Sequence, residues 1–160
     1  MSGRVHDPWD RKLLYTVGHS NRSQEELVEI LRAAGVHTLV DVRTIPASRR
    51  FPHFNRSELG GTLLQNGVIY HHLGKRLGGL VEGSYESHMA TRDFLKGLGT
   101  LEDLAGSSVT AIMCAERDPA ECHRRHLADL LTDRGWEVVH LLGLDENEPH
   151  HSSDQQRRLF

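Results

Sequence analysis

Apolar and polar positions in the first quarter of the chain predict a strand, a helix and a second strand. Residues 13–17 form a short apolar run that is typical of a β-strand. Ser23 and Glu26 then form a capping box, and apolar residues recur at helical spacing as far as Gly35, which favours a helix end. A second apolar run over residues 36–42 predicts the next strand. Because such units are normally right-handed crossovers, we expect the two strands to be parallel.

The middle of the chain combines irregular loops with weaker elements. The stretch "TIPASRRFPHFN" contains two prolines and predicts an irregular loop. Asn55 and Glu58 can cap a short helix after it, although Gly60 and Gly61 each cost about 1 kcal/mol relative to alanine. The run "VIYHHL" predicts a third strand, and a cationic, glycine-rich loop, "GKRLGGLVEGS", follows it. Leucines and aromatic residues between positions 85 and 104 predict one or two further helices.

The last third of the chain predicts two more strands around a helix. "SVTAIMCA" is almost continuously apolar, as expected of a strand at the centre of a sheet that is covered on both faces. The next helix is expected to begin at Asp118, with Pro119 in its first turn and Glu121 completing a capping box. Its apolar stripe contains Leu127 and Leu131, and "WEVVHLLG" predicts the fifth strand.

This order of elements predicts a three-layer α/β fold with about five mostly parallel strands flanked by helices. The length of 160 residues and the hydrophobic content of 38% suffice for one domain with a genuine core. We assign residues 1–143 to that domain and residues 144–160 to a polar tail. Ligand sites in such sheets form at the carboxyl ends of the strands. The segments that follow the predicted strands there are residues 19–22, 43–50, 72–79 and 114–125.

The composition narrows the class of protein. The sequence contains no run of about 18 apolar residues that could span a membrane, and its N-terminus lacks the apolar centre of a signal peptide. Two cysteines eight positions apart do not form a secreted disulfide framework, so we predict a cytoplasmic protein with reduced thiols and no membrane partner. The formal net charge of −3 argues against a protein coated in positive charge for nonspecific DNA binding, but it leaves room for a local basic cleft.

The stretch "CAERDPAECHRR", residues 114–125, holds most of the candidate chemistry. A helix N-terminus has free N–H groups and favours anions, so the first hypothesis is an anion-binding wall with phosphate as the natural ligand. His123 lies four positions before Leu127 and is expected to face the cleft from the start of the helix's inward face. Cys122 and Arg124 are expected on either side of it.

A thiol or metal site is the second hypothesis for this stretch. The helix N-terminus would lower the pKa of Cys122, whereas Cys114 is either a nucleophile or a buried core thiol. An arginine six positions after Cys114, as in phosphatase loops, is absent because Ala120 stands there. Zinc sites usually have two close pairs of ligands, and only Cys122 and His123 form one, so we predict no metal ligands. The sequence requires no cofactor. Glu116 is either a general acid or base in a desolvated cleft or part of a surface ion pair.

Cationic side chains collect on the same side of the predicted sheet. Arg43, Arg49 and Arg124 are among those that would give the strand ends a cationic lining. Phe51 and Phe54 stand in the arginine-rich loop, where they either stack on exposed bases or pin the loop to the core. Both alternatives stay open.

The blocks "YTVGHSNRSQEEL", "VDVRTIPASRRFPHFN", "GVIYHHL", "LGG" and "CAERDPAECHRRHLA" together resemble the family catalogued as domain of unknown function 488. The resemblance covers about residues 13–143, and it implies a small α/β protein without an established activity. It places the family's blocks at strand-end positions that the pattern selects independently. Those positions are Gly18, His19, Ser20, Asp41, Arg43, Phe54, Asn55, Cys114, Glu116, Cys122, His123 and Arg124.

The last five residues have the form Gln-x-x-Leu-Phe, which is similar to a bacterial sliding-clamp binding peptide. In such a peptide the Leu and Phe side chains enter an apolar pocket and the Gln makes directional hydrogen bonds. The polar stretch "DENEPHHSSD" before it would act as a flexible linker. We therefore predict that Gln156, Leu159 and Phe160 bind the clamp, with a tail that folds back onto its own domain as the alternative.

These observations predict a protein that processes nucleic acid or a nucleotide, with an anion-binding cleft at the strand ends and a role in DNA repair or modification. The alternatives are a noncatalytic adaptor that links DNA or a nucleotide to the clamp, and a cytoplasmic thiol or metal enzyme that acts on an anionic metabolite. The predicted catalytic residues are Glu116, Cys114 and His123. The predicted substrate- or anion-binding residues are His19, Ser20, Asn21, Asp41, Arg43, Arg49, Asn55, Cys122 and Arg124.

Overall fold

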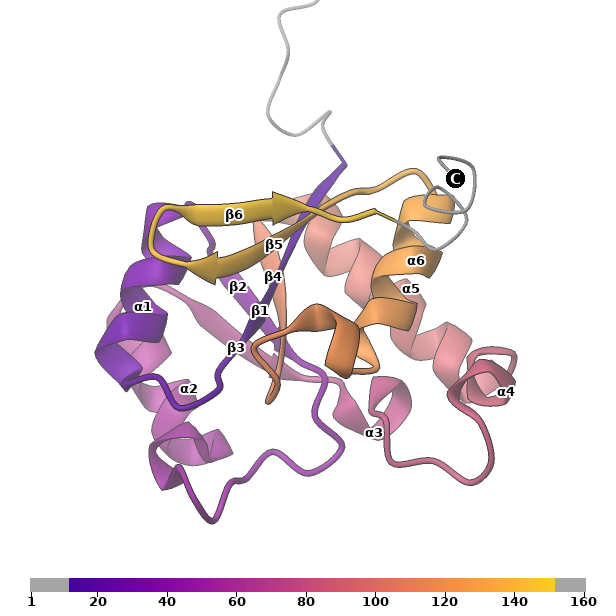
Figure 1. Ribbon diagram of the computed structural model, residues 1–160, viewed down its shortest axis with the longest axis horizontal. Helices are drawn as coiled ribbons and strands as arrows, with labels where there is room; N and C mark the ends of the chain where they lie inside the picture. Colours follow the sequence, from indigo (N-terminus) through magenta and orange to yellow (C-terminus); the bar gives the residue numbers. More distant parts are fainter. Residues whose placement is uncertain (1–11, 152–160) are drawn as a thin grey trace, which may run out of the picture.

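A six-stranded sheet forms the centre of the protein, which a computed structural model describes over residues 12–151 (Figure 1). The strand order is β3-β2-β4-β1-β5-β6. Strands β1 to β5 are parallel, and β6 pairs antiparallel with β5 at one edge. The strands are β1 (Leu13–Gly18), β2 (Thr38–Asp41), β3 (Ile69–His72), β4 (Thr110–Cys114), β5 (Glu137–Gly143) and β6 (Glu146–Pro149).

Helices cover both faces of this sheet, which confirms the predicted three-layer α/β fold. Helices α1 and α2 lie on one face, and α5 and α6 lie on the other (Figure 1). Every helix within residues 12–151 is too short or too polar to cross a membrane. The helices are α1 (Gln24–Ala33), α2 (Arg56–Gln65), α3 (Gly74–Leu77), α4 (Tyr85–Met89), α5 (Arg92–Ser107) and α6 (Arg124–Asp133), with 3₁₀ turns η2 (Pro52–Phe54) and η3 (Pro119–Glu121).

Local sequence signals explain where two of these helices begin and one ends. The Ser23 side chain accepts a hydrogen bond from the Glu26 N–H at 3.0 Å, as the capping box at the start of α1 requires. Thr91 accepts the Phe94 N–H at 3.1 Å in the same way and starts α5. Gly35, with φ of 74°, takes the left-handed conformation that follows the end of α1.

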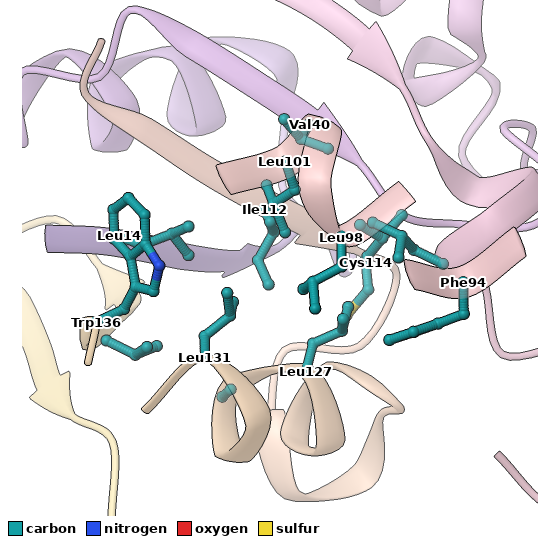
Figure 2. Packing of buried hydrophobic residues seen from close by; sticks show 14 of the residues in the cluster. Leu14, Val40, Phe94, Leu98, Leu101, Ile112, Cys114, Leu127, Leu131 and Trp136 are labelled. Carbon is teal, nitrogen blue, oxygen red and sulfur yellow. The ribbon is translucent and has the colours of Figure 1, made fainter. Parts of the chain in front are cut away.

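The two faces of the sheet bury separate apolar cores. Successive residues of β4 point to opposite faces, so Ile112 and Cys114 join the core under α5 and α6, while Ala111 and Met113 join the core under α1 and α2. Figure 2 shows the first of these cores, in which Leu127 of α6 points toward the end of β4. All five residues of β4 are buried, as the continuous apolar run predicts.

Strand β4 lies between β2 and β1. After β4 the chain turns to the face that α5 and α6 cover, whereas after β1 and β2 it turns to the face that α1 and α2 cover. Helices α1 and α2 follow β1 and β2 on one face, whereas α6 follows β4 on the other (Figure 1). Connections that diverge in this way leave a crevice beyond the carboxyl ends of the strands. The ends of β1, β2 and β4 are therefore the place where a ligand site is expected.

One glycine lets the chain segments after β1 and β4 approach each other closely. A Cβ at Gly18 would collide with the backbone carbonyl of Glu116. The close approach is held by two backbone hydrogen bonds, from the His19 N–H to Cys114 O at 2.9 Å and from the next N–H to Ala115 O at 2.9 Å. Gly18 thus brings His19 next to residues 114–125, the segment called the cysteine corner below.

The segment after β4 differs from the single helix that the sequence predicts. Asp118 caps only a 3₁₀ turn, in which its Oδ1 accepts the Ala120 N–H at 2.9 Å. Cys122 is then extended, with φ −132° and ψ 152°, and α6 begins at Arg124. The prediction of one helix from Asp118 onward is wrong because Cys122 interrupts it. The Cys122 sulfur accepts the Arg124 N–H at 3.4 Å and takes the place of a capping oxygen at the start of α6.

A sixth strand lies in the stretch that the sequence pattern assigns to the polar tail. All four residues of β6 are exposed and show no apolar alternation, so periodicity carries no signal for this strand. A turn at Asp145, with φ of 60°, returns the chain along β5. The predicted clamp-binding residues, Gln156, Leu159 and Phe160, lie outside the described residues.

Candidate active site

A pocket of about 420 Å³ lies beyond the carboxyl ends of β1, β2 and β4. Its volume is in the range of small-molecule sites in proteins. Six of the predicted site residues line it together, although they come from four segments of the chain. They are His19, Arg43, Cys114, Glu116, Cys122 and His123.

Cys122 and His123 form a thiol–imidazole pair at the wall of this pocket. The Cys122 sulfur lies 3.5 Å from His123 Nδ1. His123 Nε2 lies 3.2 Å from Val42 O, and because a carbonyl oxygen only accepts, Nε2 carries a proton. Nδ1 therefore faces the Cys122 sulfur, where it can receive a proton and return it.

Three hydrogen-bond donors surround the Cys122 sulfur: the Cys114 thiol, the His123 ring and the Arg124 N–H. The hydrogen bond from Cys114 is the largest cause that lowers the pKa of Cys122 to about 4, against the opposing effect of burial. The same hydrogen bond, together with burial, raises the pKa of Cys114 well above its ordinary value. The Cys114 sulfur also lies 3.5 Å from Glu116 O. The Cys122 thiolate is the stronger acceptor for the single Cys114 proton, because it is charged and the carbonyl oxygen is not. Cys122 is therefore the thiolate at neutral pH, and Cys114 stays a thiol.

His19 is a neutral imidazole in the same pocket. It is 3% exposed, and burial is the largest cause that lowers its pKa to about 4. Its Nδ1 donates to Ser20 O at 3.0 Å, so Nε2 is unprotonated and accepts from Arg43 Nη1 at 3.4 Å. The ring stacks on Phe54 with the two centroids 4.6 Å apart. These contacts fix His19 in one tautomer and one orientation.

Asp41 and Arg43 form a buried ion pair at the end of β2. Arg43 Nη2 lies 2.7 Å from Asp41 Oδ2, and Arg43 Nε donates to Oδ1 at 2.9 Å. Arg43 Nη2 also donates to Phe54 O at 2.8 Å. Tyr70 on β3 donates its hydroxyl proton to the same carboxylate, and its pKa is raised by burial and by this hydrogen bond. Asp41 is fully buried, so it positions Arg43 at the pocket wall without reaching solvent.

Arg124 is a buried cation in the cysteine corner. It is 1% exposed, and its Nη2 donates to Glu116 O at 3.2 Å and to Arg117 O at 3.0 Å. Its Nε and Nη1 have no hydrogen-bond partner among the residues that the structure describes. The Arg124 charge acts to lower the pKa of Cys114, although the hydrogen bond and burial outweigh it. The guanidinium therefore places a buried positive charge beside Cys114, while the Arg124 backbone N–H contacts Cys122.

A second pocket, of about 450 Å³, adjoins the first and shares part of its wall, including Glu116. The predicted residues Ser20 and Asn21 line this adjoining pocket. Arg50 and Phe51 line it as well, with the guanidinium carbon 5.6 Å from the centre of the aromatic ring. The adjoining pocket therefore presents a cation and an aromatic face beside the thiolate site.

The other predicted residues of the arginine-rich loop have separate surroundings. Asn55 Oδ1 accepts the Ser48 N–H at 2.7 Å and holds the loop along the pocket. Arg49 is exposed and lines neither pocket. Phe54 is fully buried and pins the loop to the core, whereas Phe51 faces the adjoining pocket. Both aromatic residues therefore pack against the core under α1 and α2, and Phe51 also lines the adjoining pocket.

Sequence reasoning missed the contributions of Gly79 and Tyr70. A Cβ at Gly79 would lie 2.9 Å from His123 Nδ1, so glycine lets this loop close over the imidazole. The glycine pair in "LGG" is the available signal for that approach. Tyr70 gives no signal in "VIYHHL", because its contact with Asp41 joins two different strands.

Metal-ligand geometry is absent from the described part of the chain. Among residues 12–151, no group of three or more His, Cys, Asp or Glu side chains is placed to hold a metal ion. Four residues with side chains of the zinc-ligating types share the 420 Å³ pocket but do not form such a group. They are His19, Cys114, Cys122 and His123.

A polar network lies apart from this site, beside β5 and β6. His150 Nε2 donates to Asp129 Oδ1 at 2.7 Å, because a carboxylate only accepts. In the neutral ring His150 Nδ1 then accepts from His140 Nε2 at 2.8 Å, and His140 Nδ1 accepts from the Thr16 hydroxyl at 2.5 Å. His140 stays neutral, since burial is the largest cause that lowers its pKa to about 3. The pocket of about 490 Å³ next to this network contains no cysteine, so the candidate nucleophile lies elsewhere.

A protein-family model described as Domain of unknown function DUF488 matches residues 23–131, which is more than half of the chain. The match includes Arg43 and the whole cysteine corner, and His19 lies just before it. Comparison with curated proteins and with solved structures finds no match.

Proposed function

The chain belongs to the family of Domain of unknown function DUF488, and we propose that it is a cysteine-dependent enzyme acting on a nucleotide or on a nucleotide unit of a nucleic acid. The observation that carries this proposal is the Cys122 sulfur at the pocket wall, with three hydrogen-bond donors around it. A core thiol needs no such donors, and a noncatalytic adaptor has no use for a thiolate. The thiol chemistry therefore gains most support among the hypotheses from the sequence.

Cys122 supplies the nucleophile in this proposal, and His123 moves the proton. The thiolate attacks an electrophilic atom of the substrate and forms a covalent S–substrate bond, while the leaving group takes the proton from His123 Nδ1. A water molecule then attacks this intermediate, returns a proton to Nδ1, and the thiolate departs. The bond from His123 Nε2 to Val42 O holds the ring in one orientation during both steps. The net reaction is hydrolysis.

Arg43 and His19 fit substrate binding in this scheme. The Arg43 guanidinium is held by Asp41, so its positive charge is fixed before a substrate arrives. His19 is neutral and accepts from Arg43, so it restrains the guanidinium from a second side. An anionic group of the substrate would meet a charge that needs no reorganisation.

The adjoining pocket favours a nucleotide over a smaller metabolite. Arginine side chains pair with phosphate, and bases stack on aromatic rings. Arg50 over Phe51 offers both features next to the thiolate site. A nucleotide would place its base against Phe51 and its reacting group near Cys122.

Incubation with a panel of mononucleotides and a short oligonucleotide tests this proposal. The wild-type protein should convert at least one of them, and Cys122→Ser should lower turnover by at least about 10³-fold. Mass spectrometry of an acid-quenched reaction should detect a substrate fragment bound to Cys122. The matched control, Cys114→Ser, keeps the nucleophile and should keep measurable turnover. Equal turnover in the wild type and Cys122→Ser, or conversion of none of these substrates, would overturn the proposal.

The tail extends the proposal to a partner. We propose that Gln156, Leu159 and Phe160 bind a bacterial sliding clamp, which would deliver the enzyme to DNA in the cytoplasm for repair or modification. The full chain should be retained by immobilised clamp protein, and deletion of residues 156–160 should abolish this retention. Arg157→Ala is the control, because it leaves the three anchor residues in place. Clamp binding that survives the deletion, or that is absent from the full chain, refutes this partner.

A further inference from the structure

We infer that Cys114 and Cys122 form a redox pair, in which a hydroperoxide oxidises Cys122 and Cys114 then closes a reversible disulfide that switches the site off. The inference rests on the proposed function, since the same thiolate serves both roles. These are the only two cysteines in the sequence, so no other intramolecular partner competes for the oxidised sulfur.

The fold brings the two sulfur atoms together although eight positions separate them in the sequence. Cys114 ends β4, and Cys122 is the extended residue between η3 and α6. Both line the same pocket, and Cys122 packs against the core that contains Cys114. A disulfide holds its Cβ atoms about 3.5–4.5 Å apart, so its closure brings the extended Cys122 segment against the end of β4.

The two cysteines differ in the way that such a pair requires. Cys122 is half-buried at the pocket wall, where a small hydroperoxide can reach it. Cys114 is 1% exposed and is therefore shielded from direct oxidation. His123 and the Arg124 N–H stabilise Cys122 in the thiolate form, which is the form that attacks peroxides. The order of events is thus fixed, with Cys122 oxidised first.

The chemistry balances with a hydroperoxide as the only co-reactant. The Cys122 thiolate attacks one peroxide oxygen, an S–O bond forms, the O–O bond breaks, and the departing oxygen takes the proton of the His123 imidazolium. This step gives a sulfenic acid and an alcohol or water. The Cys114 sulfur then loses its proton, attacks the Cys122 sulfur and expels hydroxide, which leaves as water with that proton.

Arg124 favours the second step. Its buried positive charge acts to lower the pKa of Cys114, and this charge stabilises the transient thiolate that attacks the sulfenic acid. The resulting disulfide occupies the nucleophile and removes the negative charge from the pocket wall. Activity should therefore stop on oxidation and return with a dithiol reductant.

Treatment of the full chain with hydrogen peroxide near pH 7 tests the redox pair by intact-mass spectrometry. The wild-type protein should lose two hydrogens, both thiols should resist maleimide when the oxidised chain is then unfolded in denaturant, and prior dithiothreitol should restore both. Cys114→Ser should gain one oxygen that a 1,3-diketone traps, because the resolving thiol is missing. Cys122→Ser should stay reduced at the same peroxide concentration.

Two results would overturn the inference: addition of oxygens to the wild type without loss of two hydrogens, or equal oxidation of Cys122→Ser and the wild type. Alkylation by iodoacetamide separates this failure from failure of the proposed function. Rapid alkylation of Cys122 near pH 7 without disulfide formation refutes the redox pair alone and leaves the nucleophile in place. If Cys122 is neither alkylated rapidly nor joined to Cys114 in a disulfide, both the redox pair and the proposed nucleophile are refuted.

Discussion

At the scale of single residues, Cys122 owes its thiolate character to neighbours from two different elements. The N–H of Arg124 belongs to the first turn of α6, and this part of the environment follows from the sequence near a helix start. The larger contribution comes from Cys114 at the end of β4. His123 adds a third donor, whose ring is oriented by Val42 O. Each of these neighbours is therefore expected to lower the pKa of Cys122 by a different amount.

The rate of Cys122 alkylation should change little from about pH 9 to about pH 5 and fall only in more acidic solution, because its pKa is lowered to about 4. A free cysteine, with a pKa of about 8.5, loses reactivity throughout that range. Cys114→Ala removes the largest cause of the lowered pKa and should move the midpoint upward. His123→Asn removes both a hydrogen bond and a positive charge from the thiolate and should also move it upward. Mass spectrometry of iodoacetamide labelling across this pH range measures both midpoints.

A wild-type midpoint close to that of a free cysteine would contradict the thiolate assignment. An unchanged midpoint in Cys114→Ala would instead show that the two sulfur atoms do not share a hydrogen bond. Cys114 itself should remain unlabelled in the folded wild type, because it is buried and its pKa is raised.

At the scale of elements, the Asp41 carboxylate ties three segments together at the pocket. It receives the Tyr70 hydroxyl from β3 and the Arg43 guanidinium from the segment after β2. Through Arg43 it also reaches Phe54 O in η2. If one group of such a buried network is removed, its former partners lose a hydrogen bond that water cannot replace.

Tyr70→Phe should lower the free energy of unfolding by about 1.5–3 kcal/mol, because it removes a hydrogen bond to a buried carboxylate. Asp41→Asn should cost more, about 3–5 kcal/mol, since it leaves the Arg43 charge without its counter-ion. Tyr15→Phe is the matched control on β1, and it should change stability by less than about 0.5 kcal/mol. Urea unfolding near pH 7 measures all three. Equal effects of the two tyrosine substitutions would show that the Tyr70–Asp41 hydrogen bond does not stabilise the fold.

The elements that the sequence predicts well are those with local signals. Ser23 and Glu26 mark the start of α1 within four residues of chain, and the buried run of β4 marks the centre of the sheet. The break at Cys122 escapes prediction because Asp118 and Pro119 form the same start signal for a 3₁₀ turn as for a helix. Strand β6 escapes because pairing with β5, and not an apolar face, places it in the sheet.

The location of the candidate site could be predicted from local sequence signals, but the surroundings of its side chains could not. The rule that sites form at strand ends gathers the six residues that line the pocket, because it depends only on the order of strands and helices. It does not reveal that Arg124 is buried beside the pocket or that Arg49 lines neither pocket. Those facts depend on contacts between segments that are distant in the sequence. Side-chain roles therefore needed the structure, whereas the location did not.

At the scale of the whole molecule, two buried histidines couple protonation to folding. His19 is held between the ends of β1 and β2, with the charges of Arg43 and Asp41 and the ring of His53 acting on it. His140 on β5 is influenced by His150 just after β6, by Arg124 at the start of α6 and by Asp118 before η3. For both residues burial is the largest cause of the lowered pKa. The pKa of His19 falls to about 4 and that of His140 to about 3.

The free energy of unfolding should therefore fall as the pH drops below the ordinary histidine value of 6.5. Above that value both residues are neutral in the folded and unfolded states and add no pH dependence. Below it the unfolded chain binds protons that His19 excludes down to about pH 4 and His140 to about pH 3 when folded, so stability falls by up to about 1.4 kcal/mol per pH unit for each. Urea unfolding in steps through this range should give a shallower slope for His140→Asn, and an unchanged slope for the exposed His37→Asn. A slope in His140→Asn equal to that of the wild type would mean that the β5–β6 network does not exclude a proton from His140, and the acid sensitivity would then belong to other groups.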